Sequence, residues 1–326
     1  MSRSRRVAAI VATAALAVSA LAGCSASADT ADDADSGLNI WYVNPLPSYP
    51  AWGASSKQFE DNAEELGYRA TAVGPSALSP TDMVSMIESA IADDADGLIT
   101  CNIDPSIMSD TIQKAIDAGI AVVNIPCEDE IVAWSAGTDP KDVGTQAADL
   151  IASDSSEDAQ VAIIRPSLED AISQTQVDAF QARIDEKYPD MKIVTVDTGN
   201  TDAAQDATKI GSILAAYPEV SAIWCAEGTC PGAAASALPE AGKEPGDIYV
   251  LGLDDVDTTL AAIEAGWVQT SFNQCFFYAT PLAVALIKAA VDGNPYPDKR
   301  YAIPTDPITA DDLPYEGCPS SAIPEP

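Results

Sequence analysis

The sequence predicts an α/β protein with two doubly wound lobes, each built around a parallel sheet, and three observations support this fold class. From Leu38 onward, short apolar runs alternate with amphipathic stretches of helical length. Runs such as Ile120–Ile125 are apolar almost throughout, which is typical of parallel strands covered on both faces. About 290 residues follow the N-terminal leader and tether, more than a single lobe normally contains.

The chain begins with a leader that resembles a bacterial lipoprotein signal peptide. Three arginines lie within the first six residues, and the apolar run Val7–Ala20 is shorter than the roughly 20 residues that span a bilayer. The box Leu21–Cys24 then marks Cys24 as the lipidated first residue of the mature protein. An ordinary secretory signal, or an uncleaved anchor with Cys24 incidental, is the alternative. Residues 25–37 are small, polar or acidic and predict a flexible tether.

The body that follows is predicted to alternate strands with helices. The expected strands are residues 38–43, 68–73, 97–101, 120–125, 160–164, 192–197, 222–225, 248–253 and 268–272. The expected helices are residues 54–66, 81–92, 107–118, 141–152, 170–187, 202–216, 232–238, 257–265 and 281–291. Several helices end before a glycine suited to the position after the C-cap, as at Gly67, Gly119 and Gly266. This alternation predicts function at the carboxyl ends of the strands.

Composition excludes several classes of function. The chain has 16 basic and 50 acidic residues, and three of the basic residues lie in the leader. So acidic a surface excludes nucleic-acid binding and electrostatic docking on anionic lipid. Histidine is absent from the sequence, which removes Ser-His-Asp and Cys-His catalysis and His-bearing zinc sites. The sequence also has no G-x-G-x-x-G or P-loop motif, and we expect no cofactor and no metal.

The cysteine count fits an exported protein. Seven cysteines are present, and removing Cys24 leaves six, an even number for an oxidising compartment. Three disulfides are expected, although some of the six could instead be free buried thiols. Counting alone allows about 15 pairings of six cysteines.

Five segments together resemble a known family. They are the turn 44–46, residues 96–99, residues 119–123, residues 249–255 and residues 260–266. In order and spacing they are similar to the ribose-binding type of periplasmic sugar-binding protein, the solute receptor of an ABC importer. The resemblance covers residues 38 to about 308. It implies the type I arrangement of two lobes joined by three hinge crossings, with the ligand held between them.

The resemblance also implies how the chain is divided. The first lobe would comprise residues 38–137 and 275–300, and the second lobe residues 138–274 and 301–326. In such a protein the carboxyl ends of the strands of both lobes face the cleft, as the switch-point rule for open α/β sheets requires.

The resemblance implies five ligand-binding candidates. Asp254 would accept hydrogen bonds from sugar hydroxyls, although a solvated turn would also suit an aspartate. Gln274 would read the ligand at the third hinge, with a plain hinge residue as the alternative. Tyr49 and Trp52 would stack on the sugar ring, unless one caps the core. Asn44 would lie at the mouth of the first strand, unless it only forms a turn.

Departures from the family pattern define four more candidates. Glu128 follows Pro126–Cys127 where sugar binders of this type often carry Asp-Arg. Gln174 takes the place of a ligand-clasping arginine, and Glu227 replaces an Asn-Asp pair. Arg165 could restore one donor or could be a surface residue. A pocket with added carboxylates and no firm arginine disfavours anions and suits a neutral sugar or polyol, or an amine-bearing ligand.

The same alignment suggests the disulfide pairing. Two of the cysteines, at or just past the ends of strands expected to be parallel neighbours, are close enough to bridge, and a second pair brackets the loop that carries Glu227. The third pair would tie the tail to the hinge. The expected pairs are Cys101–Cys127, Cys225–Cys230 and Cys275–Cys318.

The resemblance implies a binding protein and not an enzyme. We expect a monomer, lipid-anchored outside the cytoplasm, in a periplasm or on the outer face of the plasma membrane. It would capture a small polar solute, most simply a sugar or polyol, and deliver it to an ABC transporter permease. One alternative is a sensory lipoprotein that presents its bound ligand to a membrane receptor. Another is a glycoside hydrolase that would use Glu227 and Asp254 as its two carboxyl groups.

Overall fold

The computed structural model describes residues 37–127, 130–168, 170–297 and 299–326. The predicted lipidation site Cys24, the tether residues 25–36 and the candidate Glu128 lie outside the described residues. Within the described part of the chain, no helix is both long enough and apolar enough to cross a membrane.

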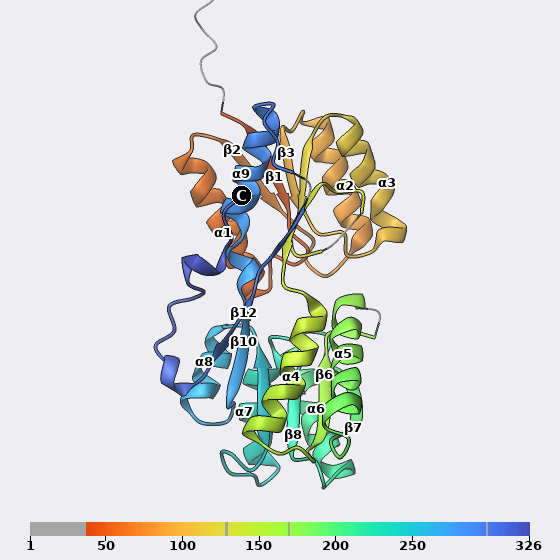
Figure 1. Ribbon diagram of the computed structural model, residues 1–326, viewed down its shortest axis with the longest axis vertical. Coiled ribbons are helices and arrows are strands. Elements are labelled where there is room, and N and C mark those ends of the chain that lie inside the picture. The colour runs from red at the N-terminus through yellow and green to blue at the C-terminus, as the bar shows by residue number, and fades with distance from the viewer. Residues whose placement is uncertain (1–36, 128–129, 169, 298) are drawn as a thin grey trace, which may run out of the picture. The chain divides into compact units, whose positions relative to one another are not determined.

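The first lobe is built around a six-stranded parallel sheet with the order β11-β5-β4-β3-β1-β2. Figure 1 labels β1, β2 and β3 of this sheet. Its strands are β1 (Asn39–Val43), β2 (Arg69–Val73), β3 (Gly97–Thr100), β4 (Ala121–Asn124), β5 (Trp134–Gly137) and β11 (Lys299–Ala302). Its helices are α1 (Pro50–Glu65), α2 (Pro80–Ala92), α3 (Pro105–Asp117) and α9 (Thr280–Val291). Gly97 lets α9 approach the sheet, because a Cβ there would lie 2.3 Å from Ile287.

The second lobe holds a six-stranded sheet with the order β12-β10-β9-β8-β6-β7. Its strands are β6 (Gln160–Arg165), β7 (Lys192–Thr198), β8 (Ala222–Cys225), β9 (Tyr249–Leu253), β10 (Thr270–Gln274) and β12 (Thr305–Ile308). Its helices are α4 (Pro140–Asp154), α5 (Ala171–Lys187), α6 (Ala203–Ala216), α7 (Cys230–Glu240) and α8 (Asp257–Glu264). The strands are parallel except β12, which runs antiparallel to β10.

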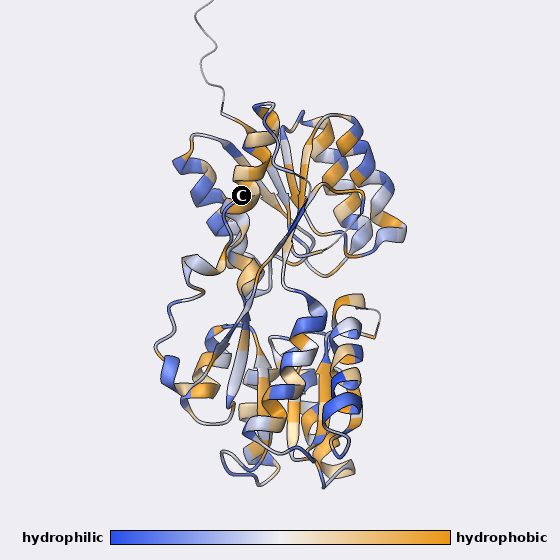
Figure 2. Cartoon of the chain, viewed as in Figure 1, coloured by the Kyte–Doolittle hydropathy of each residue, from blue (hydrophilic) through white to orange (hydrophobic). Residues whose placement is uncertain are grey.

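Each sheet has an apolar core on both faces, which explains its near-continuous apolar strands. In the first lobe, α1 and α9 cover one face and α2 and α3 cover the other. In the second lobe, α4 and α5 cover one face, and α6, α7 and α8 the other. Figure 2 shows the apolar residues concentrated along the strands, while the outward helix faces are hydrophilic. The α/β class and the two doubly wound lobes predicted from the sequence are thus confirmed.

Most of the helices that follow a strand begin with a side-chain cap. The caps are Ser79, Asp104, Asp139, Asp170 and Asp202, and each accepts a hydrogen bond from a backbone N–H in the first turn of its helix. Proline occupies the first turn of α2, α3 and α4, where its missing N–H costs nothing. These caps fix the helix N-termini at the strand ends, the edge of each sheet where function is expected.

The structure corrects several element predictions. Strands β5, β11 and β12 were not predicted, because their sequences lack an apolar run and pair only through tertiary contacts. Strand β10 covers Thr270–Gln274 in place of the predicted 268–272. Helix α1 begins at Pro50, four residues before the predicted start, since proline suits a first turn.

The division of the chain between the lobes also differs from the expectation. Tyr301 and Ala302 were assigned to the second lobe, but they pair with β5 in the first sheet. Part of the C-terminal tail returns to the first lobe, where Cys318, Ala322 and Ile323 pack against the core that α1 and α9 cover. The chain thus passes between the sheets after β5, after β10 and after β11, and the tail crosses back again.

Candidate ligand-binding cleft

A cleft of about 480 Å³ lies at the carboxyl ends of the strands of both lobes. From the first lobe it is lined by the loop after β1, the loop after β3 and the 3-10 turn Cys275–Tyr278. From the second lobe it is lined by the N-terminal turns of α4 and α5 and by the loops after β8 and β9. Of the predicted ligand-binding residues, five line it: Tyr49, Trp52, Glu227, Asp254 and Gln274.

Asp254 is the centre of a hydrogen-bond network that links the two lobes across the cleft. The hydroxyl of Tyr49, at the N-cap of α1, donates to Asp254 Oδ2 over 2.5 Å. The amide of Gln274, the last residue of β10, donates to Asp254 Oδ1 over 2.9 Å. Asp254 has a φ of +66°, a left-handed conformation that aspartate tolerates better than most residues. Its carboxylate is therefore fixed by both its backbone and its partners.

Burial sets the protonation behaviour of this network. Asp254 is 3 % exposed, and desolvation raises its pKa to about 6, although the hydrogen bonds from Gln274 and Tyr49 oppose the shift. Burial also raises the pKa of Tyr49 well above 10, and the adjacent Asp254 charge adds to that rise. At neutral pH the pair is thus a charged acceptor and a neutral donor, the two groups that a ligand hydroxyl can replace.

Aromatic side chains form one wall of the cleft. Trp52 packs edge-on against Phe277 at 5.0 Å between ring centroids and lies 5.6 Å from Phe276. Tyr49 lies 6.5 Å from Phe277. All four belong to the first lobe, and all line the cleft. Such a wall suits the C–H face of a ring-shaped ligand.

Polar groups without partners lie opposite this wall. Gln176 on α5 and Thr138 after β5 line the cleft at 3 % and 7 % exposure. Gln176 Oε1 and Thr138 Oγ1 have no hydrogen-bond partner among the described residues. Because buried polar atoms are normally paired, these two atoms are available to a polar group that enters the cleft.

Three of the predicted binding residues, Asn44, Arg165 and Gln174, do not line the cleft. Asn44 is fully buried and holds the loop after β1, donating to the Trp52 carbonyl and the Ser56 hydroxyl and accepting from the Leu46 N–H. It forms the turn that carries Tyr49, which is the alternative function of an asparagine there.

Arg165 and Gln174 pair with each other and do not line the cleft. The Arg165 guanidinium, 1 % exposed, donates to the Ser173 hydroxyl, the Asp170 carbonyl and Gln174 Oε1. Gln174 in turn donates to Asp178 on the exposed side of α5. Neither residue lines the cleft. The hydrogen-bonding capacity of the guanidinium is taken up by groups at the start of α5.

Sequence reasoning missed Gln176, Thr138, Phe276 and Phe277. Gln176 is two residues after Gln174, so the two side chains point to opposite sides of α5. The sequence does not show how α5 is rotated about its axis, and this rotation decides which side faces the cleft. The pair Phe276–Phe277 begins two residues after the predicted hinge residue Gln274, a signal that could have been used. Thr138 directly follows β5, a strand that the sequence pattern did not indicate.

The basic side chains that line the cleft come from Lys141 on α4 and Arg300 on β11. Arg300 lies 3.6 Å from Asp139 in an ion pair. No cluster of three or more metal-binding side chains occurs among the described residues. Of the carboxyl groups in the lining, Asp139 caps α4 and pairs with Arg300, and Asp170 caps α5, whereas Asp254 is held by donors from both lobes.

The three disulfides expected from the resemblance are present. Their Cα–Cα distances are 5.0 Å for Cys101–Cys127, 5.4 Å for Cys225–Cys230 and 5.6 Å for Cys275–Cys318. Cys101 and Cys127 line the cleft themselves, and Cys225–Cys230 closes the loop that carries Glu227. These bridges hold cleft loops before a ligand arrives, which lowers the ordering cost of binding.

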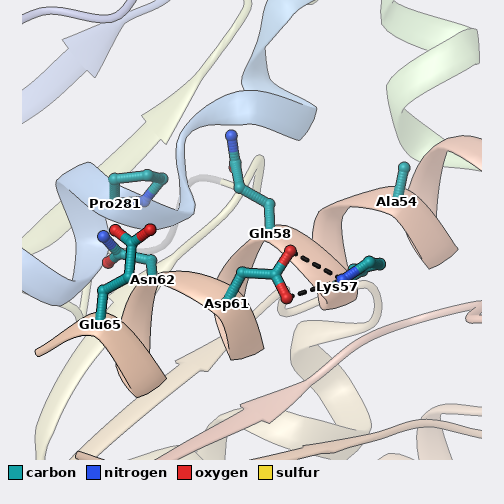
Figure 3. A pocket seen from close by; sticks show the side chains of 7 residues that line it. All are labelled: Ala54, Lys57, Gln58, Asp61, Asn62, Glu65 and Pro281. Carbon is teal, nitrogen blue, oxygen red and sulfur yellow. Dashed lines mark hydrogen bonds and ion pairs between the residues drawn. The ribbon is translucent and has the colours of Figure 1, made fainter. Parts of the chain in front are cut away.

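A second depression lies on the outer side of α1, next to the start of α9 (Figure 3). The ion pair between Lys57 and Asp61, at 2.7 Å, crosses it. Both side chains are exposed, at 73 % and 58 %, so the pair is screened by solvent. With exposed charges and no predicted binding residue, this depression is a surface feature.

Comparison with known proteins places this geometry in a family. The chain is 28 % identical over 236 residues to the D-apiose import binding protein of Actinobacillus succinogenes, which covers 72 % of this chain and 74 % of that protein. It superposes with a TM-score of 0.82 on an ABC transporter solute-binding protein from Burkholderia graminis in complex with D-arabinose, at 21 % identity, covering 87 % of this chain and 99 % of that one.

A second solved structure has the same fold. GanP, a glucose-galactose binding protein from Geobacillus stearothermophilus, superposes with a TM-score of 0.78 at 24 % identity, covering 85 % of this chain and 99 % of its own. The model of the family described as "Periplasmic binding protein domain" matches residues 40–295, which is most of the chain. The chain therefore belongs to the periplasmic binding protein family.

Proposed function

We propose that this chain is an extracytoplasmic solute-binding protein that captures a neutral monosaccharide or polyol in the cleft and delivers it to an ABC permease. The observation that carries this proposal is the Tyr49–Asp254–Gln274 network, which joins an acceptor of one lobe to a donor of the other. A sugar hydroxyl that donates to Asp254 can take the place of Tyr49 without leaving the carboxylate unpaired.

The chemistry of the lining supports a neutral, ring-shaped ligand. The aromatic wall of Trp52, Phe276 and Phe277 suits the apolar face of a sugar, while Gln176 and Thr138 offer partners to its hydroxyls. An anionic ligand would meet the Asp254 charge, with Arg165 turned away into α5. Relatives named for D-apiose import and for D-ribose and D-allose binding are consistent with this ligand class.

Binding without chemical change accounts for the residues present. Histidine is absent from the sequence, which removes imidazole as a catalytic base, and the disulfides and the hydrogen-bond network of the cleft favour holding a ligand. We propose further that Cys24 carries the lipid anchor and that residues 25–37 tether the lobes near the permease, where a short flexible link gives a high effective concentration.

A thermal-shift screen tests the proposal. We expect at least one of D-apiose, D-ribose, D-arabinose, D-allose, glucose and galactose to raise the Tm of the mature protein. At a hundredfold excess over Kd, binding stabilises the folded state by about 2.7 kcal/mol. An amino sugar and a quaternary amine complete the panel. A shift with the amines alone, or with none of the compounds, would contradict a neutral sugar site.

A further inference from the structure

Two buried carboxyl groups face each other at the second-lobe side of the cleft. Glu227 follows β8 and lines the cleft at 2 % exposure, and Asp206 on α6 lies behind it with none of its surface exposed. Each has one oxygen with a donor. The Thr201 N–H donates to Glu227 Oε2 over 2.9 Å, and the Thr229 hydroxyl donates to Asp206 Oδ2 over 2.7 Å.

The other two oxygens have no donor among the described residues. They are Glu227 Oε1 and Asp206 Oδ1. A Cβ built on Gly199 would lie 1.5 Å from Asp206 Oδ1 and 2.3 Å from Glu227 Oε1, so both oxygens occupy the space that this glycine leaves. Two ionised carboxylates repel each other at such proximity, whereas a single proton between them gives each orphan oxygen a partner.

We propose that Asp206 and Glu227 share one proton, and that Asp206 is thereby a positioning residue that holds Glu227 neutral beside the ligand. The part of this inference that concerns ligand affinity rests on the proposed function. The shared proton itself rests only on the four oxygens and their surroundings. Nothing in the sequence motifs marks Asp206, which lies in the first turn of α6 and does not itself end a strand.

The charges around the pair favour the protonated state. Burial is the largest cause that raises the pKa of Glu227, to about 9, and Asp206 is the second. Lys209 on α6 is engaged with Asp197 on β7 at 2.9 Å, and Arg165 at the end of β6 is engaged with α5. Other titratable groups on the neighbouring elements include Asp202 before α6, Asp254 and Asp255 after β9, and Tyr49 from the first lobe. Among the described residues, no lysine or arginine forms an ion pair with either carboxyl.

The shared proton makes ligand binding depend on pH. A neutral sugar that fills the cleft excludes water from Glu227, which raises the cost of a second charge on the pair. The occupied protein therefore holds the proton more tightly than the free protein. By linkage, the shared proton leaves the affinity for a neutral sugar unchanged near neutral pH and lowers it by up to tenfold per pH unit above the pKa of the free pair.

Infrared spectroscopy of the ligand-free mature protein tests the proton directly. We expect a C=O stretch of a protonated carboxyl at neutral pH, lost above about pH 9 and missing from Glu227→Gln. Asp206→Asn removes the neighbouring charge and should shift the loss of the band to lower pH. Glu219→Gln, an exposed residue before β8, is the matched control and should keep the band. If the wild-type protein has no such band, or if Glu227→Gln retains it, the shared proton is refuted.

Calorimetric titration with D-ribose, D-arabinose, D-apiose and D-allose tests the consequence for binding. In the wild-type protein, affinity for the sugar that binds should fall above about pH 9, whereas Glu227→Gln, which imitates the neutral acid, should give a flat profile there. Parallel profiles would overturn the coupling between proton and ligand. Failure of all four sugars to bind would count against the proposed function, while the infrared band would still decide the shared proton.

Discussion

At the residue scale, the cleft is organised by where buried carboxyl groups find donors. Asp254 is held by Tyr49 and Gln274, so it is ionised and available to a ligand near neutral pH. Glu227 has a donor on only one oxygen and faces Asp206 with the other. The second lobe thus presents a charged acceptor, Asp254, and a neutral carboxyl, Glu227, from two neighbouring cleft loops. Their protonation states differ because their burial and their hydrogen-bond partners differ.

These carboxyls predict how stability depends on pH. Burial raises the pKa of Asp254 to about 6 and that of Glu227 to about 9, so the folded protein binds more protons than the unfolded chain between about pH 4 and pH 9. The free energy of unfolding should therefore fall as pH rises through this range. For Asp254 alone the fall is on the order of 3 kcal/mol between about pH 4 and pH 6.

Urea unfolding at several pH values measures this dependence. Asp254→Asn should reduce the slope of the curve between about pH 4 and pH 6, and Glu227→Gln should reduce it from about pH 4.5 up to about pH 9. Below about pH 4 the trend should reverse, because hydrogen bonds lower the pKa values of Asp93, Asp149 and Asp312. A stability that rises steadily from pH 4 to pH 9 would contradict these assignments.

At the element scale, the C-terminal tail adds a covalent link between the lobes. Strand β12 pairs with β10 of the second lobe, and Tyr315 donates to Asp306 over 2.8 Å. The tail then reaches Cys318, which is bonded to Cys275 at the start of the first lobe's 3-10 turn. This bridge closes a loop with a sequence separation of 43, against 5 for Cys225–Cys230.

Loop length predicts how much each of the two disulfides stabilises the folded protein. By chain entropy, a loop of this length is worth about 4 kcal/mol and the short loop about 2 kcal/mol. Replacing Cys275 and Cys318 together by alanine should therefore lower the urea midpoint more than the same change at Cys225 and Cys230. It should also expose the tail to limited proteolysis. A larger loss from the short loop, with the tail still protected, would show that the tail is held by packing alone.

The elements also show what the sequence could and could not predict. Apolar runs between glycine-ended helices predicted strands β1 to β4 and β6 to β10. The short strands β5, β11 and β12 carry no such run, since they form at the lobe crossings. Strand β12 even contains Pro307, which only an edge strand accommodates.

The site was predictable to the extent that strand ends determine it. Asp254 directly follows β9 and Gln274 ends β10, and both could be identified because these strand ends match the ligand-binding positions of the family that the sequence resembles. Arg165 also ends a strand, but its guanidinium donates to groups at the start of α5. This orientation depends on tertiary packing and cannot be derived from the spacing of residues in the sequence. Asp206 could not be identified, because its role depends on the space that Gly199 leaves on a different element.

At the scale of the whole molecule, two sheets bring one half of a binding site each to a shared cleft. The first lobe contributes the aromatic wall and Tyr49, while the second contributes the carboxyl groups and Gln176. Neither half could enclose a sugar alone. The hydrogen bond between Tyr49 and Asp254 joins these two halves directly. A ligand that replaces it couples its own binding to the arrangement of both lobes.

Calorimetric titration of wild-type and Asp254→Asn protein with D-apiose, D-ribose, D-arabinose and D-allose tests the central claim most directly. The account predicts one-site binding of at least one of these sugars by the wild-type protein. The substitution should weaken it by about tenfold or more, since a hydrogen bond to a charged group is worth about 1.5–3 kcal/mol. Asp257→Asn, an exposed change in the same segment, should bind like the wild type. Equal affinity in the wild-type and Asp254→Asn proteins, or no binding of any of the four sugars, would contradict it.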